Sequence, residues 1–248
     1  MNRRTQLSLL AAIAFLLAAP MIQAAGGGAH LEPAGVNLED EAALQRGAKL
    51  FVNYCLSCHG ADYMRYNRLS EDLGLSEEVV MQQLVFADRK IGETMQIAMR
   101  DDDAERWFGK APPDLSLVGR SRGADWLYSY MRSFYQDETG AWNNTVLPNA
   151  SMPHVMWELQ GIQSPVFRTE TEGGVELQVV DHLELTTPGR LSPEEYDNTV
   201  RDLVTFLDYL GEPAKLKRKQ IGIWVILFLA VFAFLAYLLK AEYWRDVH

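Results

Sequence analysis

Hydrophobic residues recur at helical spacing in two stretches of the chain. The first stretch, residues 38–54, opens with acidic residues, which the positive end of a helix dipole favours. Its apolar positions, three or four residues apart, are Leu44, Ala48, Phe51 and Val52. Gly47 lies inside this pattern, at a cost to the helix of about 1 kcal/mol relative to alanine. We therefore expect a packing reason for Gly47, such as the close approach of another helix.

The second stretch, residues 191–210, has start and stop signals at its two ends. Ser192–Glu195 reads Ser-Pro-Glu-Glu, a capping box with proline at the first helical position. Gly211 follows the last apolar position. The apolar face consists of Tyr196, Val200, Leu203, Val204, Leu207 and Leu210. We predict that this helix packs across residues 38–54, with Gly47 at the contact.

A third hydrophobic pattern is continuous. Residues 221–239 carry no charge, and at about 1.5 Å per residue they nearly span a hydrocarbon core of about 30 Å. Aromatic residues near both ends fit the membrane interfaces. We predict one transmembrane helix, residues 220–240, and a cytoplasmic tail, residues 241–248.

The N-terminus has the pattern of a secretory signal peptide over residues 1–24. Arg3 and Arg4 precede an apolar run that is too short to span a bilayer comfortably, and Ala24 offers a small residue at the cut. An uncleaved anchor is the alternative. Either segment exports the domain that follows, residues 25–214, to the periplasmic side of a bacterial inner membrane.

Charges beside the predicted span indicate the opposite orientation. A basic collar, residues 215–219, holds four Lys or Arg residues, whereas only Lys240 and Arg245 follow the span. The positive-inside rule alone would put the collar in the cytoplasm. We expect the signal peptide to set the orientation first, so that the span stops transfer and the collar meets anionic lipid head groups.

Other elements are weaker. Residues 77–85 and 126–134 read as short helices, and residues 166–185 alternate around Gly173 and Gly174, as in a β-hairpin. The predicted fold is mainly α, with a small β-hairpin excursion and one C-terminal transmembrane helix.

Composition narrows the function. With 248 residues, 48% of them hydrophobic, the chain can bury one sizeable core. A net charge of −10 argues against a nucleic-acid partner and favours a basic soluble one. The acidic run 101–105 is either a solvated surface or a docking site for a positively charged electron-transfer partner.

The candidate chemistry centres on CLSCHG, residues 55–60. Cys55 and Cys58 are the only cysteines, and His59 follows them directly. Such a motif is a covalent haem attachment site, in which the thiols add to the haem vinyl groups and the histidine binds iron. A redox dithiol needs no adjacent histidine, and a structural zinc site would usually need a second cysteine pair. A disulfide across so short a loop would be strained.

A haem that carries electrons needs a sixth iron ligand. Met152 is the candidate, because prolines at 148 and 153 hold its loop and can aim a thioether. Met156 and His154 are rivals, and the commoner role of such a methionine is to fill a core.

The segment APPDLS, residues 111–116, reads as a rigid extended turn because it contains two prolines. Asp114 or Ser116 could cap a following helix. Arg120 and Arg122 come next, and a guanidinium near the haem could neutralise a propionate. Tyr63, Tyr66 and Trp107 could line the haem edge, although aromatic residues more often belong to the core.

Together these features resemble the cytochrome c1 family, the haem subunit of the ubiquinol–cytochrome c reductase (bc1) complex, in a proteobacterial form. The likeness covers residues 35–248. Its specific motifs are APPDLS with the following arginines, MPHVMWELQG, and VTFLDYLGEP leading to the collar and the span.

The resemblance implies a class I cytochrome c-like haem domain. It implies that Cys55 and Cys58 hold one haem c covalently and that His59 and Met152 ligate its iron. It also implies that Arg120 lies near a propionate and that Pro112 packs on the haem.

The implied function is transfer of single electrons from the Rieske iron–sulfur protein to a soluble or membrane cytochrome c, without substrate chemistry of its own. Partners would be cytochrome b and the Rieske subunit in a dimeric multi-subunit complex, together with membrane lipid. Two alternatives are a free-standing membrane-anchored cytochrome c that donates to a terminal oxidase, and a haem-based sensor with an open sixth position.

Overall fold

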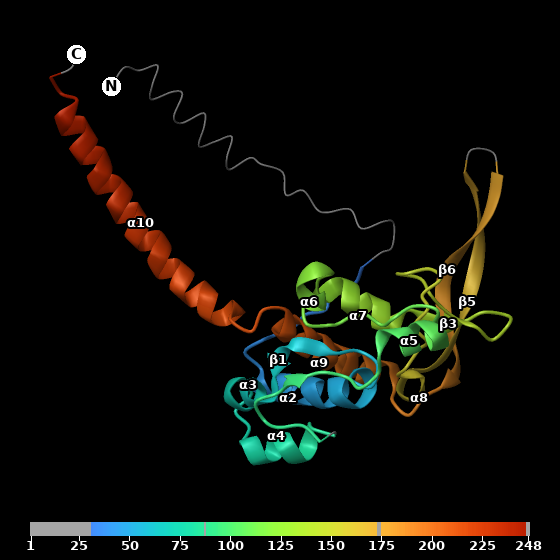
Figure 1. The fold of residues 1–248 in the computed structure, drawn as a ribbon. Helices are drawn as coiled ribbons and strands as arrows, with labels where there is room; N and C mark the ends of the chain where they lie inside the picture. Colours follow the sequence, from blue (N-terminus) through green and yellow to red (C-terminus); the bar gives the residue numbers. More distant parts are fainter. Residues whose placement is uncertain (1–30, 87, 173–174, 247–248) are drawn as a thin grey trace. The chain divides into compact units, whose positions relative to one another are not determined.

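The computed structural model describes residues 31–86, 88–172 and 175–246 (Figure 1). The predicted signal peptide, residues 1–24, lies outside these residues. So do Gly173 and Gly174 of the predicted hairpin turn, and the last two residues of the predicted cytoplasmic tail.

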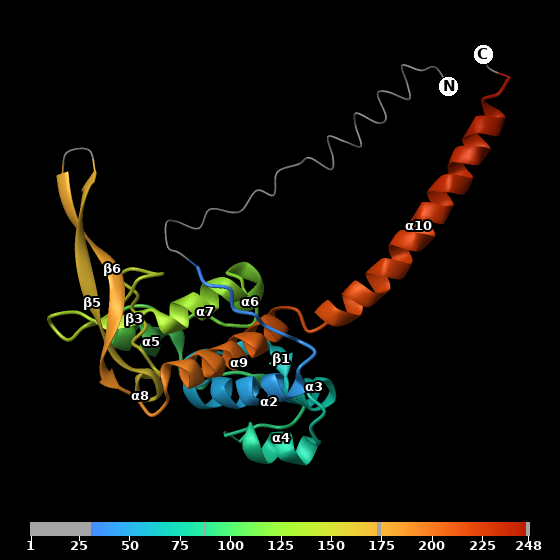
Figure 2. The same cartoon turned by 180° about the vertical axis from the view of Figure 1, so that it is seen from behind.

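Helices α2 (Glu41–Leu50) and α9 (Pro193–Gly211) lie side by side and carry much of the hydrophobic core (Figure 2). Helix α2 begins three residues later than the predicted stretch, because the Asp40 side chain caps it by accepting a hydrogen bond from the Ala43 amide at 3.0 Å. A π-helical turn, η1 (Phe51–Cys55), continues α2. This widened turn, a feature often found at functional sites, brings the chain to Cys55.

The contact between α2 and α9 depends on Gly47, as predicted. A Cβ atom at this position would lie 2.2 Å from the Asp202 carbonyl oxygen and 2.7 Å from the Phe206 Cβ. Gly119, in the short helix α6 (Val118–Ser121), is equally constrained, because its Cβ would lie 2.4 Å from the Leu207 carbonyl oxygen. The backbones of α2 and α6 therefore both lie in close contact with the backbone of α9.

The predictions for α9 are confirmed in detail. Ser192 and Glu195 form the capping box, with proline at the start of the helix. All six residues of the predicted apolar face are buried. Tyr196 also donates a hydrogen bond to the Met131 carbonyl at 2.9 Å, which ties α9 to helix α7 (Ala124–Arg132).

Within the described residues, the domain also contains short helices and three two-stranded antiparallel sheets. The remaining short helices are α3 (Tyr66–Asp72), α4 (Glu77–Gln83), α5 (Asp101–Phe108) and α8 (Trp157–Gln160). The sheets pair β1 (Ala61–Arg65) with β2 (Thr94–Met95), β3 (Phe134–Gln136) with β4 (Trp142–Asn144), and β5 (Gly161–Glu172) with β6 (Val175–Pro188). The predicted short helix at 77–85 and the predicted hairpin are both present.

The predicted helix over residues 126–134 ends too late. Helix α7 stops at Arg132, and Phe134 begins β3. The reason lies in Asn144, whose side-chain amide donates to the Tyr130 carbonyl at 2.8 Å and takes the place of the next helical N–H. Asn144 also pairs with Phe134 in the β3–β4 sheet.

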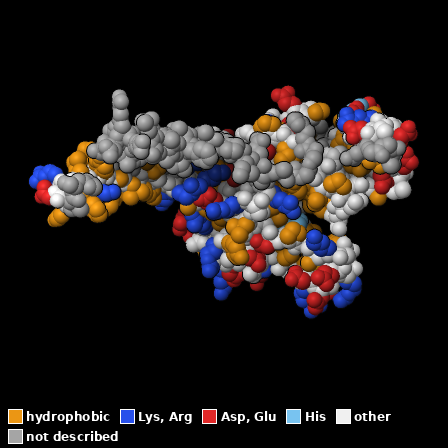
Figure 3. All heavy atoms as spheres, turned by 90° about the horizontal axis from the view of Figure 1, so that it is seen from above, with side chains coloured by type: hydrophobic (Ala, Val, Ile, Leu, Met, Phe, Trp, Pro, Cys, Tyr) orange, Lys and Arg blue, Asp and Glu red, His pale blue; other side chains and the backbone are white. Residues whose placement is uncertain are grey.

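Helix α10 (Lys215–Tyr243) has the length and composition of a membrane-spanning helix, with a mean hydropathy of 2.7 and no buried residue in its most apolar window. Figure 3 shows hydrophobic side chains exposed along it. It begins five residues before the predicted span, because the basic collar forms its first turns. The predicted fold class is therefore confirmed: a mainly helical domain with small antiparallel sheets and one apolar C-terminal helix.

Candidate haem site

The three residues of the attachment motif leave the core on one tight turn. Cys55 ends η1 and is buried, whereas Cys58 and His59 are half-buried. The Cys58 and His59 amides both donate to the Cys55 carbonyl, at 3.0 and 2.8 Å. Both cysteines are free thiols. The backbone turn therefore holds two thiols and an imidazole beside the α2–α9 core.

The Cys55 thiol does not have the environment of a reactive redox cysteine. Burial, helped by the neighbouring Cys58, raises the pKa of Cys55 to about 12. Reactive cysteines have a pKa that is lowered by nearby positive charge or a helix N-terminus. Cys55 is thus held as a buried thiol, which favours a structural attachment over thiol–disulfide exchange.

His59 is oriented by the APPDLS segment. Its Nδ1 donates a hydrogen bond to the Pro113 carbonyl at 2.7 Å, and because a carbonyl only accepts, the proton is on Nδ1 and Nε2 is left with a lone pair. Burial lowers the pKa of His59, while the Pro113 hydrogen bond and the charge of Asp114 oppose that effect. A neutral imidazole with a free Nε2 is the form that ligates iron.

APPDLS is itself tied to the chain that follows the motif. Asp114 accepts hydrogen bonds from the Asp62 and Ser116 amides, at 2.8 and 2.9 Å, and Ser116 accepts one from the Tyr63 amide at 3.1 Å. The prediction that Asp114 or Ser116 caps a helix is wrong, because α6 begins at Val118 without a side-chain cap. Both side chains instead fix the segment against β1. Pro112 is half-buried beside Pro113.

The three candidates for the sixth ligand differ in accessibility. Met156 is fully buried and His154 is 1% exposed, with its ring stacked on Phe134 at 4.9 Å. Burial lowers the pKa of His154 to about 4, so this ring is neutral. Met152 is half-buried at the edge of the same core, and the Tyr130 hydroxyl donates to its Sδ at 3.5 Å. Met152 is thus the thioether that is both accessible and oriented.

An aromatic row connects Arg122 with Met152. The Arg122 guanidinium lies 5.0 Å from the Trp126 ring centroid, and Trp126 stacks on Tyr130 at 4.9 Å. Tyr130 in turn contacts Met152. Arg120 lies elsewhere, at a cavity beside the end of α9. The sequence pointed to both arginines as candidates for the haem propionates. It did not point to Pro113 as the partner of His59 or to Tyr130 as the partner of Met152, because these contacts join segments that are distant in the chain.

The three aromatic residues that were candidates for the haem edge differ in their exposure. Tyr66 belongs to the core, with 2% of its surface exposed, whereas Tyr63 and Trp107 are 76% and 63% exposed. The acidic run 101–105 forms the first turns of α5, and only Ala104 in it is buried.

The residues present fit a haem in their chemistry, since Cys55 and Met152 pack with one hydrophobic core, and Cys58 and the oriented neutral imidazole of His59 follow Cys55 on one turn. This donor set, in a helical domain followed by an apolar helix, is that of a membrane-anchored c-type cytochrome. The chain belongs to the Cytochrome C1 family, whose model matches residues 35–247.

Several characterised proteins are similar to this chain. A protein of Allochromatium vinosum named cytochrome c1 is 51% identical over 242 residues, which cover 97% of this chain and 99% of the relative. A protein of Nitrosomonas europaea named ammonia monooxygenase gamma subunit is 46% identical over 238 residues, 95% of this chain and 97% of the relative. A protein of Bradyrhizobium diazoefficiens named cytochrome b/c1 is 30% identical, over 84% of this chain but only 34% of the relative.

Family membership confirms the resemblance drawn from the motifs. It implies a haem cofactor, electron transport, membrane attachment and membership of a bc1-type complex.

Proposed function

We propose that Cys55 and Cys58 hold one haem c through thioethers, with His59 and Met152 as the axial iron ligands. When bound, the haem supplies a centre that gains and loses one electron at a time. The observation that carries the proposal is the hydrogen bond from His59 to Pro113, because it leaves Nε2 as a neutral donor beside two thiols.

For the haem propionates, the geometry favours Arg122 over Arg120. Arg122 stacks on Trp126 in the row that reaches Met152, whereas Arg120 lines a cavity against α9. Pro112 retains its proposed role in packing on the haem, since the neighbouring Pro113 contacts His59.

The proposed role is transfer of single electrons from a Rieske iron–sulfur protein to a cytochrome c acceptor, within a dimeric bc1 complex that also contains cytochrome b. The exposed acidic turns of α5 support a basic acceptor by electrostatic steering. The Bradyrhizobium relative, whose name joins cytochromes b and c1, supports the partnership with cytochrome b.

The proposed organisation is a cleaved signal peptide (residues 1–24), a periplasmic haem domain (25–214), an inner-membrane anchor (220–240) and a cytoplasmic tail (241–248). The apolar surface of α10 supports the anchor. A protease added outside spheroplasts should remove the haem domain and spare the tail.

A reduced-minus-oxidised spectrum tests the function. The protein is purified from its own membrane in mild detergent, and we expect a c-type band with b-type bands in a preparation that oxidises quinol. A c-type band alone, with partners shown to survive the detergent, would favour the free-standing carrier. Absence of a c-type band would refute the haem assignment.

The Nitrosomonas relative raises a second candidate, a subunit of an ammonia-oxidising enzyme. Ammonia oxidation that co-purifies with this chain, in place of b-type haem and quinol oxidation, would favour it.

Tyr130→Phe is expected to lower the midpoint potential. Removing the hydroxyl leaves the Met152 sulfur with more electron density for iron, which stabilises the oxidised state. A hydrogen bond is worth about 1 kcal/mol, so the ratio of reduced to oxidised protein at one applied potential should fall by roughly fivefold. A redox titration of the c-type band measures it. Tyr135→Phe is the matched control, since Tyr135 lies in β3 and the hydroxyl that donates to Met152 is that of Tyr130. Equal potentials in the two variants would refute the role of Tyr130.

A further inference from the structure

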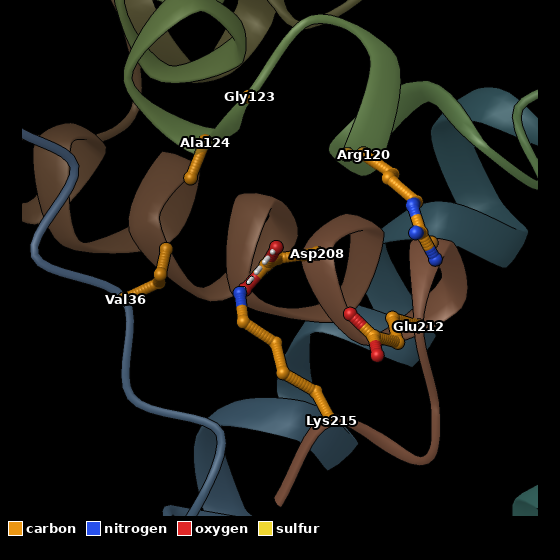
Figure 4. Close-up of a pocket in the computed structure, with 9 residues that line it drawn as sticks. Val36, Arg120, Gly123, Ala124, Asp208, Glu212 and Lys215 are labelled. Atoms are coloured by element: carbon orange, nitrogen blue, oxygen red, sulfur yellow. Dashed lines mark hydrogen bonds and ion pairs between the residues drawn. The ribbon is translucent and has the colours of Figure 1, made fainter. Parts of the chain in front are cut away.

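A cavity of about 300 Å³ lies where α6, α7 and the end of α9 meet the first residue of α10 (Figure 4). Cys55, His59 and Met152 are not among the residues that line it. Its charged lining residues are Arg120, Asp208, Glu212 and Lys215, and its lining also includes Gly119 and Gly211. The cavity is therefore lined both by the haem domain and by the first residue of the predicted membrane helix.

Both carboxylates in this cavity are already matched by cations from α10. Asp208 is buried, and both of its oxygens accept hydrogen bonds from the Lys215 ammonium, at 3.0 and 2.7 Å. Glu212 pairs with Arg218, and its pKa is lowered chiefly by that hydrogen bond. The charges of these four residues balance.

Arg120 adds one positive charge to this balanced set. Its guanidinium has no hydrogen bond or ion pair to any side chain among residues 31–86, 88–172 and 175–246, and no interaction joins it to Glu212 in Figure 4. Its backbone is held firmly, because Gly119 and Gly211 bring α6 and α9 into direct contact on either side of it. The cavity thus presents an arginine whose backbone is held and whose guanidinium acts on Glu212 through its charge but is not tied to it by a hydrogen bond.

The cavity lies close to the predicted membrane surface. Lys215 precedes the first residue of the uncharged segment, Ile221, by six helical residues, a rise of roughly 9 Å at 1.5 Å per residue. The head-group layer is about 5–8 Å thick on each side of the hydrocarbon core. A phosphate at the outer part of this layer would be within reach of a cavity lined by Lys215.

We propose that this cavity binds the phosphate of an anionic phospholipid, with the Arg120 guanidinium as its main donor. A guanidinium binds phosphate oxygens in pairs, and the surplus charge selects against a zwitterionic head group. Exposed Lys217 and Lys219 of the collar would add general attraction to an anionic surface. The proposal rests on the membrane anchoring proposed above, and it assigns Arg120 a role outside the haem site.

Binding of phosphatidylglycerol to the full haem-loaded chain in neutral detergent tests the site, with native mass spectrometry to count bound lipid. We expect Arg120→Gln to weaken binding by about tenfold, the effect of losing a charge-assisted hydrogen bond. Lys217→Gln is the control, because it also removes one positive charge from this region but does not line the cavity. It should change binding by less than twofold.

Two further titrations identify the ligand. Phosphatidylcholine should bind much more weakly than phosphatidylglycerol, and inorganic phosphate should not displace the lipid at equal concentration. Equal losses in the two variants, equal binding of both lipids, or displacement by inorganic phosphate would each overturn the proposal. The c-type spectrum of the same samples reports the haem assignment independently, so either proposal can fail alone.

Discussion

Gly47→Ala is expected to destabilise the haem domain by at least about 2 kcal/mol, even after the gain of about 1 kcal/mol in helix propensity. The new Cβ would lie 2.2 Å from the Asp202 carbonyl oxygen, a backbone atom in the middle of α9. Relief requires the two helices to separate along their length, because no flexible side chain can yield at that point. Since α2 leads directly into Cys55, the variant should also accumulate less haem-attached protein.

Gly92→Ala is the matched control for this substitution. A Cβ at Gly92 would meet no atom of the described residues within 4 Å, and Gly92 has no positive φ. Denaturant unfolding of the full chain in detergent, followed by the haem absorbance, gives the free energies, and haem staining gives the yield. Equal stability of the two variants would show that α2 and α9 can separate without penalty.

Gly47 and α9 show what could be predicted from the sequence. The capping box, the apolar face and the glycine are each local signals, and they agree with one another. The attachment motif is local as well, because six consecutive residues contain its two thiols and its imidazole. These parts of the fold and of the site were therefore predictable.

The rest of the site depends on contacts that no short window contains. Pro113 is 54 positions from His59, and Tyr130 is 22 positions from Met152. The end of α7 depends on Asn144, 14 positions beyond Tyr130. Arg120 and Arg122, two residues apart at the end of α6, go to different places because Gly119 fixes α6 against α9. The different surroundings of these two arginines could not be deduced from their spacing in the sequence.

Met152→Leu is expected to leave the haem attached while lowering its midpoint potential and opening the sixth position. Cys55 and Cys58 are remote in sequence from this change, and leucine has nearly the volume of methionine, so the cost in stability should stay below about 1.5 kcal/mol. Loss of a thioether ligand removes the donor that raises the potential of His/Met haems. The reduced variant should also bind carbon monoxide, which the wild-type protein should not.

Met156→Leu is the control that distinguishes an iron ligand from a methionine that only fills the core. Met156 is fully buried, so the same exchange there is a volume-conserving change in the core and should leave the potential and the spectrum unaltered. A redox titration and carbon monoxide difference spectra of both variants measure the contrast.

If Met156→Leu lowered the potential and Met152→Leu did not, the ligand would be Met156, and α8 would have to move to expose it. If neither did, His154 would become the candidate, although its ring would first have to leave its stack on Phe134. Because Met152 alone among the three is both half-exposed and held by a hydrogen bond to its sulfur, it needs no such rearrangement.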